Sequence, residues 1–147
     1  MPTLGDSWST KQGIKSEGMN IGGEISIGAW RIKMVPAFHS CSRGNPVGFV
    51  LKNTEHGRTI YHAGDTALFS DMKLIGNEDI DVALLPIGGR YTMGIEDAVK
   101  AVELLNPHVV IPMHYNTFPA IRANAEEFKK KCASKVVILN PGEELEI

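Results

Sequence analysis

The 147-residue sequence predicts an α+β domain in which helices cover a mixed sheet. Two observations lead to this prediction. The first half of the chain carries short apolar stretches separated by turn residues, a pattern typical of an antiparallel meander. The second half alternates amphipathic stretches with short apolar runs, which is typical of helices connecting buried parallel strands.

The predicted meander begins after a polar leader. Residues 1–17 are rich in Gly, Ser and Lys, and we interpret them as an arm or a truncated edge, with the domain itself spanning residues 18–147. β-branched and aromatic residues then predict four strands, and Gly28 and the Glu55-His56-Gly57 turn separate two pairs of them. These strands cover 24–27, 30–35, 47–52 and 59–62.

The second half begins with a short helix expected over 67–75 and a buried strand expected over 82–87. Apolar residues from Ile95 to Leu105 recur at helical spacing, with Thr92 as the expected N-cap and Asn106-Pro107 as the end. Asn124, followed three residues later by Glu127, predicts the start of another helix. The remaining strands are expected over 109–113, 135–139 and 143–147.

Composition excludes several classes of protein. The net charge is −2 and the longest run of like charge is Lys129–Lys131, so we expect no nucleic-acid partner and no membrane surface. No apolar stretch is long enough to span a bilayer. Cys41 and Cys132 fit no CxxC pattern, which favours reduced thiols and a cytoplasmic location.

Three polar residues follow apolar strands: His39 after KMVPAF, Asp65 after TIYHAG and His114 after VVIPM. Strand ends hold a backbone firmly while leaving the side chain open to a cleft. Imidazole and carboxylate together are the ligands preferred by zinc, iron or manganese. The pattern therefore predicts a metal site, with Thr66 as a candidate donor that orients the Asp65 carboxylate.

The segments PAFHS, YHAGDT, LLPIGGRYTMG and IPMHYNTFP resemble the metallo-β-lactamase superfamily, in particular its branch of small metal-dependent hydrolases. The resemblance implies an αββα four-layer sandwich, with this chain covering mainly its C-terminal half. It also implies a dinuclear site in which His39 binds the first metal, Asp65 bridges both metals and His114 binds the second.

The implied activity is hydrolysis by a metal-bound hydroxide. Its substrate would be a small molecule with an ester, lactone, phosphodiester or amide bond. Asp65 and His114 would be the catalytic residues. The cofactor would be one or two divalent ions, with zinc expected and manganese or iron as alternatives.

The family's HxHxDH motif is absent, because the histidines at 39, 56, 62, 108 and 114 form no HxH pair. Three sources of the missing ligands are open: a longer parent protein, a partner chain with the N-terminal half, or a homo-oligomer. The alternative function is a catalytically incomplete half-domain that acts in binding or assembly. In either case, one face of the strands over 24–62 is expected to be apolar and open.

Other residues carry weaker hypotheses. His62 is a candidate hydrogen-bond partner of a metal ligand, a candidate substrate contact, or a strand histidine bonded to backbone. Tyr115 and Asn116 are candidate substrate contacts, or ordinary loop residues. Ser40, Cys41 and Ser42 include candidate nucleophiles, but the sequence has no GxSxG motif. The stretch from Tyr91 to Met93 is a candidate cleft lining.

Overall fold

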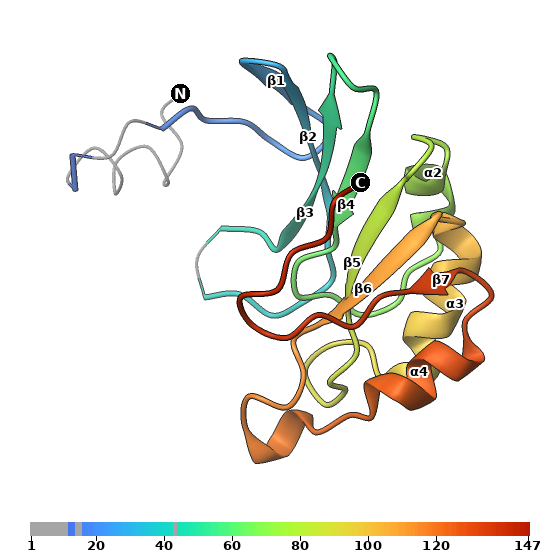
Figure 1. The fold of residues 1–147 in the computed structure, drawn as a ribbon. Helices are drawn as coiled ribbons and strands as arrows, with labels where there is room; N and C mark the ends of the chain where they lie inside the picture. Colours follow the sequence, from blue (N-terminus) through green and yellow to red (C-terminus); the bar gives the residue numbers. More distant parts are fainter. Residues whose placement is uncertain (1–11, 14–15, 43) are drawn as a thin grey trace.

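A computed structural model describes residues 12–13, 16–42 and 44–147. The described strands form one seven-stranded sheet in chain order, and helices lie on one side of it (Figure 1). Most of the predicted arm over 1–17 lies outside the described residues. Among the described helices, none has the length and apolar character needed to cross a membrane.

The sheet is mixed, as the sequence predicted. Its first four strands pair antiparallel, whereas β4, β5, β6 and β7 pair parallel. The strands are β1 (Glu24–Ile27), β2 (Trp30–Pro36), β3 (Val47–Asn53), β4 (Thr59–His62), β5 (Val82–Pro86), β6 (Val109–Met113) and β7 (Lys135–Val136). The strand predicted over 143–147 is wrong, because β7 is the last strand and residues 143–147 carry no strand assignment.

Three α-helices and one 3-10 helix connect the parallel strands: α2 (Met72–Gly76), α3 (Ile95–Leu105), η1 (Pro119–Ile121) and α4 (Ala125–Lys131). The helix predicted over 67–75 begins later than expected. The N-cap of α3 is Gly94 rather than the predicted Thr92, so no side chain caps this helix. Asn124 does cap α4, because its side chain accepts from the backbone nitrogens of Glu126 and Glu127.

The hydrophobic core lies between the sheet and the helices. Residues paired across neighbouring strands share a face, and Val50, Tyr61, Ala83 and Val110 form one such buried row. Phe128 of α4 is also fully buried and belongs to the same core. This layer of sheet and helices is what we expected for one half of the four-layer sandwich.

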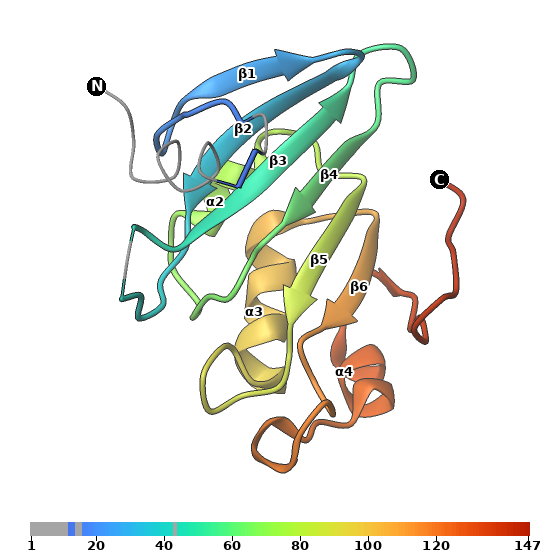
Figure 2. The ribbon, with the colours of Figure 1, turned by 90° about the vertical axis from the view of Figure 1, so that its left-hand side faces the viewer.

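None of the helices in the described residues lies on the opposite face of the sheet (Figure 2). Strand pairing places an apolar row on this face, and most of its side chains are only half-buried. We call this surface the open face; it includes Ile25, Trp30, Ile32, Met34, Phe49, Leu51, Ile60, Leu84 and Ile111. Within the described residues, this apolar row is therefore left partly open to solvent.

Lys131 joins two of the helices. It forms ion pairs with Glu96 in the first turn of α3 and with Glu127 of α4. The hydrogen bonds from Lys131 to these two carboxylates raise its pKa to about 12. The C-terminal end of α4 is therefore held close to the N-terminus of α3.

Candidate functional site

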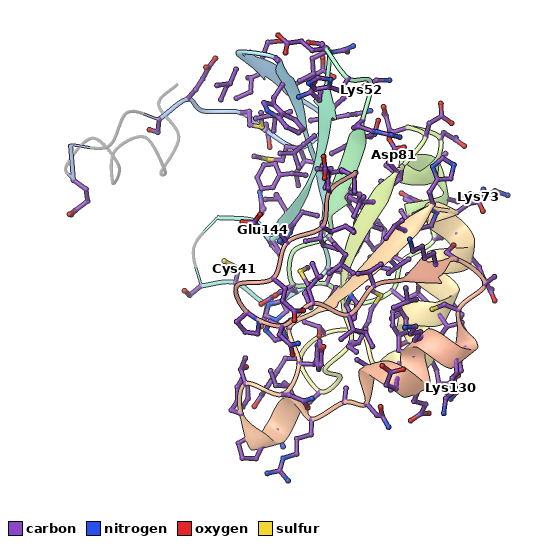
Figure 3. All side chains as sticks on the ribbon, viewed as in Figure 1. Cys41, Lys52, Lys73, Asp81, Lys130 and Glu144 are labelled. Carbon is purple, nitrogen blue, oxygen red and sulfur yellow. The ribbon has the colours of Figure 1, made fainter. Side chains whose placement is uncertain are left out.

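The three predicted ligands lie at one edge of the sheet. Strands β2, β4, β5 and β6 all point in the same direction, so their carboxyl ends meet at this edge. His39 lies on the loop after β2, Asp65 on the loop after β4, and His114 directly follows β6. Figure 3 labels Cys41 on the loop that also carries His39, and Asp81 towards the other end of the sheet.

Asp65 and His114 are brought together. The Nε2 atom of His114 lies 3.5 Å from Oδ2 of Asp65, and the two side chains are 29% and 48% exposed. Two donors bound to one tetrahedral zinc ion at their usual bond lengths stand about 3.4 Å apart. This distance is long for a direct hydrogen bond but matches neighbouring positions on a shared ion. The Asp65–His114 pair therefore fits a metal.

His114 has an unusual backbone and an unpartnered ring nitrogen. Its φ is 53°, in the left-handed region that non-glycine residues rarely adopt. Its Nδ1 atom is buried and has no hydrogen-bond partner. Strained backbone and unpaired buried polar atoms persist where the surrounding structure forces them, and they cluster at functional sites.

Asp65 is positioned through its neighbours in the chain. Gly64 has a φ of +64°, and a Cβ atom there would lie 2.5 Å from the backbone oxygen of Val47. Thr66 is fully buried, but its hydroxyl donates to the backbone oxygen of Ala67 at 2.8 Å. The prediction that Thr66 donates to the Asp65 carboxylate is thus wrong, since that proton is used by the backbone.

The structure supports His39 as a metal ligand less well than it supports Asp65 and His114. Its Nδ1 atom lies 2.7 Å from the backbone oxygen of Ser40, which leaves Nε2 as the atom available for a metal. In the described part of the chain, no group of three or more His, Cys, Asp or Glu side chains is arranged to hold a metal ion. The role of His39 as a ligand therefore stays a prediction.

Several weaker candidates have structural roles. Nδ1 of His62 accepts a hydrogen bond from the backbone nitrogen of Gly64, so the side chain is bonded to backbone. The Asn116 amide makes two hydrogen bonds with the backbone of Ala123, both 3.0 Å long, and it holds the loop after β6. Met93 is 1% exposed and lies in the core, so it does not line a cleft.

Sequence reasoning missed a cavity near His114. Its volume is about 600 Å³, and Tyr115, Asn116 and Arg122 are among the residues that line it. Asp65 and His114 are not part of this lining, so the cavity is adjacent to the pair rather than around it. Arg122 had no sequence signal, because it lies outside the strand-end pattern and in no motif.

The fold and the Asp–His pair at the carboxyl edge of a mixed sheet define an α/β domain with a candidate metal centre. A family model described as "Beta-lactamase superfamily domain" matches residues 9–114. The chain belongs to this superfamily. The resemblance noted in the sequence is thereby confirmed.

Relatives support the same assignment. The chain is similar to a "UPF0173 metal-dependent hydrolase" of Thermofilum pendens, with 50% identity over 142 residues that cover 93% of this chain and 61% of the relative. A second relative with that description, from Thermus thermophilus, is 50% identical over 151 residues, covering 96% and 66%. The chain thus spans between three-fifths and two-thirds of the length of these relatives.

A solved structure shows the same fold. Igni18, described as a novel metallo hydrolase from Ignicoccus hospitalis, superposes with a TM-score of 0.86 and 45% sequence identity. The match covers 93% of this chain and 63% of Igni18. The mixed sheet and its helix layer therefore correspond to a large part of a metallo hydrolase.

Proposed function

We propose that this chain forms part of a metal-dependent hydrolase and supplies Asp65 and His114 to its metal centre. The observation that carries the proposal is the 3.5 Å separation of His114 Nε2 and Asp65 Oδ2 at the carboxyl edge of the sheet. Its membership of the superfamily and the descriptions of its relatives support the same activity. A divalent ion bound there would activate a water molecule and polarise the substrate.

The residues of this chain would hold and orient the reacting groups. Asp65 offers two carboxylate oxygens, which allow it to bind one ion or to bridge two. His114 offers Nε2, and its orientation is limited by the buried ring edge that carries Nδ1. We propose His39 as a third ligand through its Nε2 atom, because its Nδ1 is bonded to Ser40. We expect zinc, with manganese or iron as alternatives.

The substrate belongs to this proposal as well. We propose a small molecule with an ester, lactone, phosphodiester or amide bond, since an activated water can attack each of these. The cavity lined by Tyr115 and Arg122 would hold the rest of such a molecule. It lies near the pair because Tyr115 directly follows His114 in the chain.

We also propose that another polypeptide covers the open face. The support is its row of half-buried apolar side chains and the greater length of the relatives. A partner that carries the rest of the family's fold would cover this face and would bring further ligands. For the purified chain, the available partner is a second copy of itself. Assembly through this face is also the basis of the alternative function, a binding module without catalysis.

Metal content tests the proposal. The purified chain is dialysed against zinc, manganese or iron, and bound metal is measured by elemental analysis. We expect at least half-stoichiometric metal, with clear losses in Asp65→Ala and His114→Ala. Asp71→Ala and His56→Ala are matched controls, because both residues are exposed and Asp71 makes no cap bond to α2. If the wild type retains no metal, or the controls lose as much as the two variants, the proposal fails.

Activity is then measured with the metal-loaded chain. Chromogenic ester, lactone, phosphodiester and amide substrates distinguish the four bond types. Hydrolysis that disappears in Asp65→Ala but persists in Asp71→Ala supports the enzyme. Metal binding without hydrolysis of any of the four favours the binding module.

A further inference from the structure

Thr66 connects the loops at the site edge. Its hydroxyl oxygen accepts a hydrogen bond from the backbone nitrogen of Phe38 at 3.0 Å and donates one to the backbone oxygen of Ala67 at 2.8 Å. The residue is 0% exposed. A buried hydroxyl that donates and accepts at once fixes the two backbone groups relative to each other.

Backbone hydrogen bonds extend this connection to a third loop. The backbone nitrogen of Ala67 donates to the oxygen of Phe38 at 2.9 Å, and the nitrogen of Met93 donates to the oxygen of Thr66 at 3.0 Å. The loops after β2, β4 and β5 therefore meet at Thr66. We call these four hydrogen bonds the Thr66 clasp.

The clasp lies between two of the predicted ligands. Phe38 directly precedes His39, and Thr66 directly follows Asp65. No hydrogen bond joins the His39 and Asp65 side chains in the described structure, so their separation is set by the backbones that carry them. The ring centroids of Phe38 and Phe69 lie 5.0 Å apart, and this packing also joins the loops after β2 and β4.

We propose that Thr66 is a positioning residue that sets the distance between His39 and Asp65, and through it the strength of metal binding. This inference rests on the proposed function. The hydroxyl is the group that matters: valine has nearly the same shape but can neither donate nor accept, whereas serine keeps both abilities.

Cobalt(II) provides the test, because its visible absorption reports both affinity and ligand geometry. The whole chain is titrated as wild type, Thr66→Val and Thr66→Ser. Changes in groups that orient metal ligands weaken metal binding by roughly 10- to 100-fold, and we expect a loss of this size, with an altered spectrum, for Thr66→Val. Thr66→Ser should restore both. Thr54→Val is the matched control, because its hydroxyl also donates to a backbone oxygen, that of Ala29, in a turn away from this edge.

A double-mutant cycle tests whether the effect passes through His39. If Thr66 acts by positioning His39, Thr66→Val should weaken cobalt binding much less in a His39→Ala background than in the wild type. Equal losses in both backgrounds would overturn the inference.

A measurement on the wild type covers the case in which Thr66→Val does not fold. The Phe38 amide should exchange its hydrogen more slowly once cobalt is bound, because a ligated His39 holds the clasp closed. Unchanged exchange at Phe38 would overturn the inference, as would a folded Thr66→Val with wild-type affinity and spectrum. A wild type that binds no cobalt would overturn the proposed function and the inference together. A wild type that binds cobalt, with no effect of Thr66→Val, would overturn the inference alone.

Discussion

A Cβ atom at Gly88 would lie 2.3 Å from the backbone oxygen of His114 and 2.9 Å from Cβ of Ile121. The backbone nitrogen of Ile87 donates to the oxygen of Met113 at 3.1 Å, so the parallel pairing of β5 and β6 continues to this point. Gly88 does not have a positive φ, so its backbone conformation does not require glycine. Glycine is needed there because any side chain would collide with these two atoms. The shape of the loop at His114 therefore depends on a residue in the neighbouring strand's loop.

Replacing Gly88 by alanine should destabilise the protein by about 1–3 kcal/mol, as overpacking does in a buried site. Urea unfolding measures the loss. Gly94→Ala is the comparison, because a Cβ there would meet its nearest atom, Cα of Gly89, at an ordinary 3.8 Å, so its loss should be limited to the smaller cost of alanine at the N-cap of α3. If the two variants lose the same stability, the close approach at Gly88 does not matter.

The open face should make the isolated chain self-associate. Leu51 lies on this face, opposite Ile32 and Ile60 in the neighbouring strands. Leu51→Lys should shift the chain towards the monomer in sedimentation velocity at micromolar concentration, because a charge on the face opposes its burial. Leu74→Lys is the control, since Leu74 is 64% exposed on α2. A wild type that is monomeric at this concentration contradicts the prediction.

Regular patterns made much of the fold predictable from the sequence. The apolar run of β5 and the helical spacing of α3 depend on local side-chain periodicity, and both elements are present. The prediction of a strand over 143–147 was wrong, because a strand also needs a neighbouring strand to pair with, and local sequence does not show whether one is present. α2 is shorter than predicted, because residues 67–70 form loop contacts such as the bond between Ala67 and Phe38.

The candidate site was predictable to a lesser degree. Strand ends gave Asp65 and His114, which the structure brings together. The clasp at Thr66 and the close approach at Gly88 depend on contacts between loops far apart in the chain, and no local pattern encodes these. The place of His39 depends in the same way on such contacts.

Asp81 should make stability depend on pH at the acidic end. Burial acts to raise its pKa, but hydrogen bonds from the Thr59 backbone and the Arg58 and His108 side chains lower it overall. A carboxyl whose pKa is lowered by folding stabilises the protein above its unfolded pKa, and this contribution is lost as the pH falls through the folded value.

Asp81→Asn should therefore be less stable than the wild type at pH 7. The difference should shrink below about pH 4, where the carboxyl of the unfolded chain is protonated. Urea midpoints between pH 7 and the acid limit of folding measure it, with the exposed Asp97→Asn as control. A difference that stays constant down to this limit contradicts the role of the Asp81 charge.

The two cysteines should differ in reactivity. Burial raises the pKa of the Cys132 thiol to about 11, so about one molecule in a thousand carries the reactive thiolate at pH 8. Cys41 is exposed. A chromogenic disulfide reagent should modify one thiol quickly, and Cys41→Ser should abolish this phase. Two equally fast equivalents in the native protein would show that Cys132 is not protected.

The geometry of His114 has a consequence for evolution and for engineering. Its left-handed backbone costs about 1–2 kcal/mol for a residue with a side chain, and its unpartnered Nδ1 adds a further cost. The metal-free chain thus carries a cost in stability at this position. Asparagine tolerates the left-handed region better, so His114→Asn should unfold in chelator at an equal or higher urea concentration than the wild type while binding less metal. A lower midpoint would show that the histidine ring stabilises the apo fold, and selection for stability alone would then retain it.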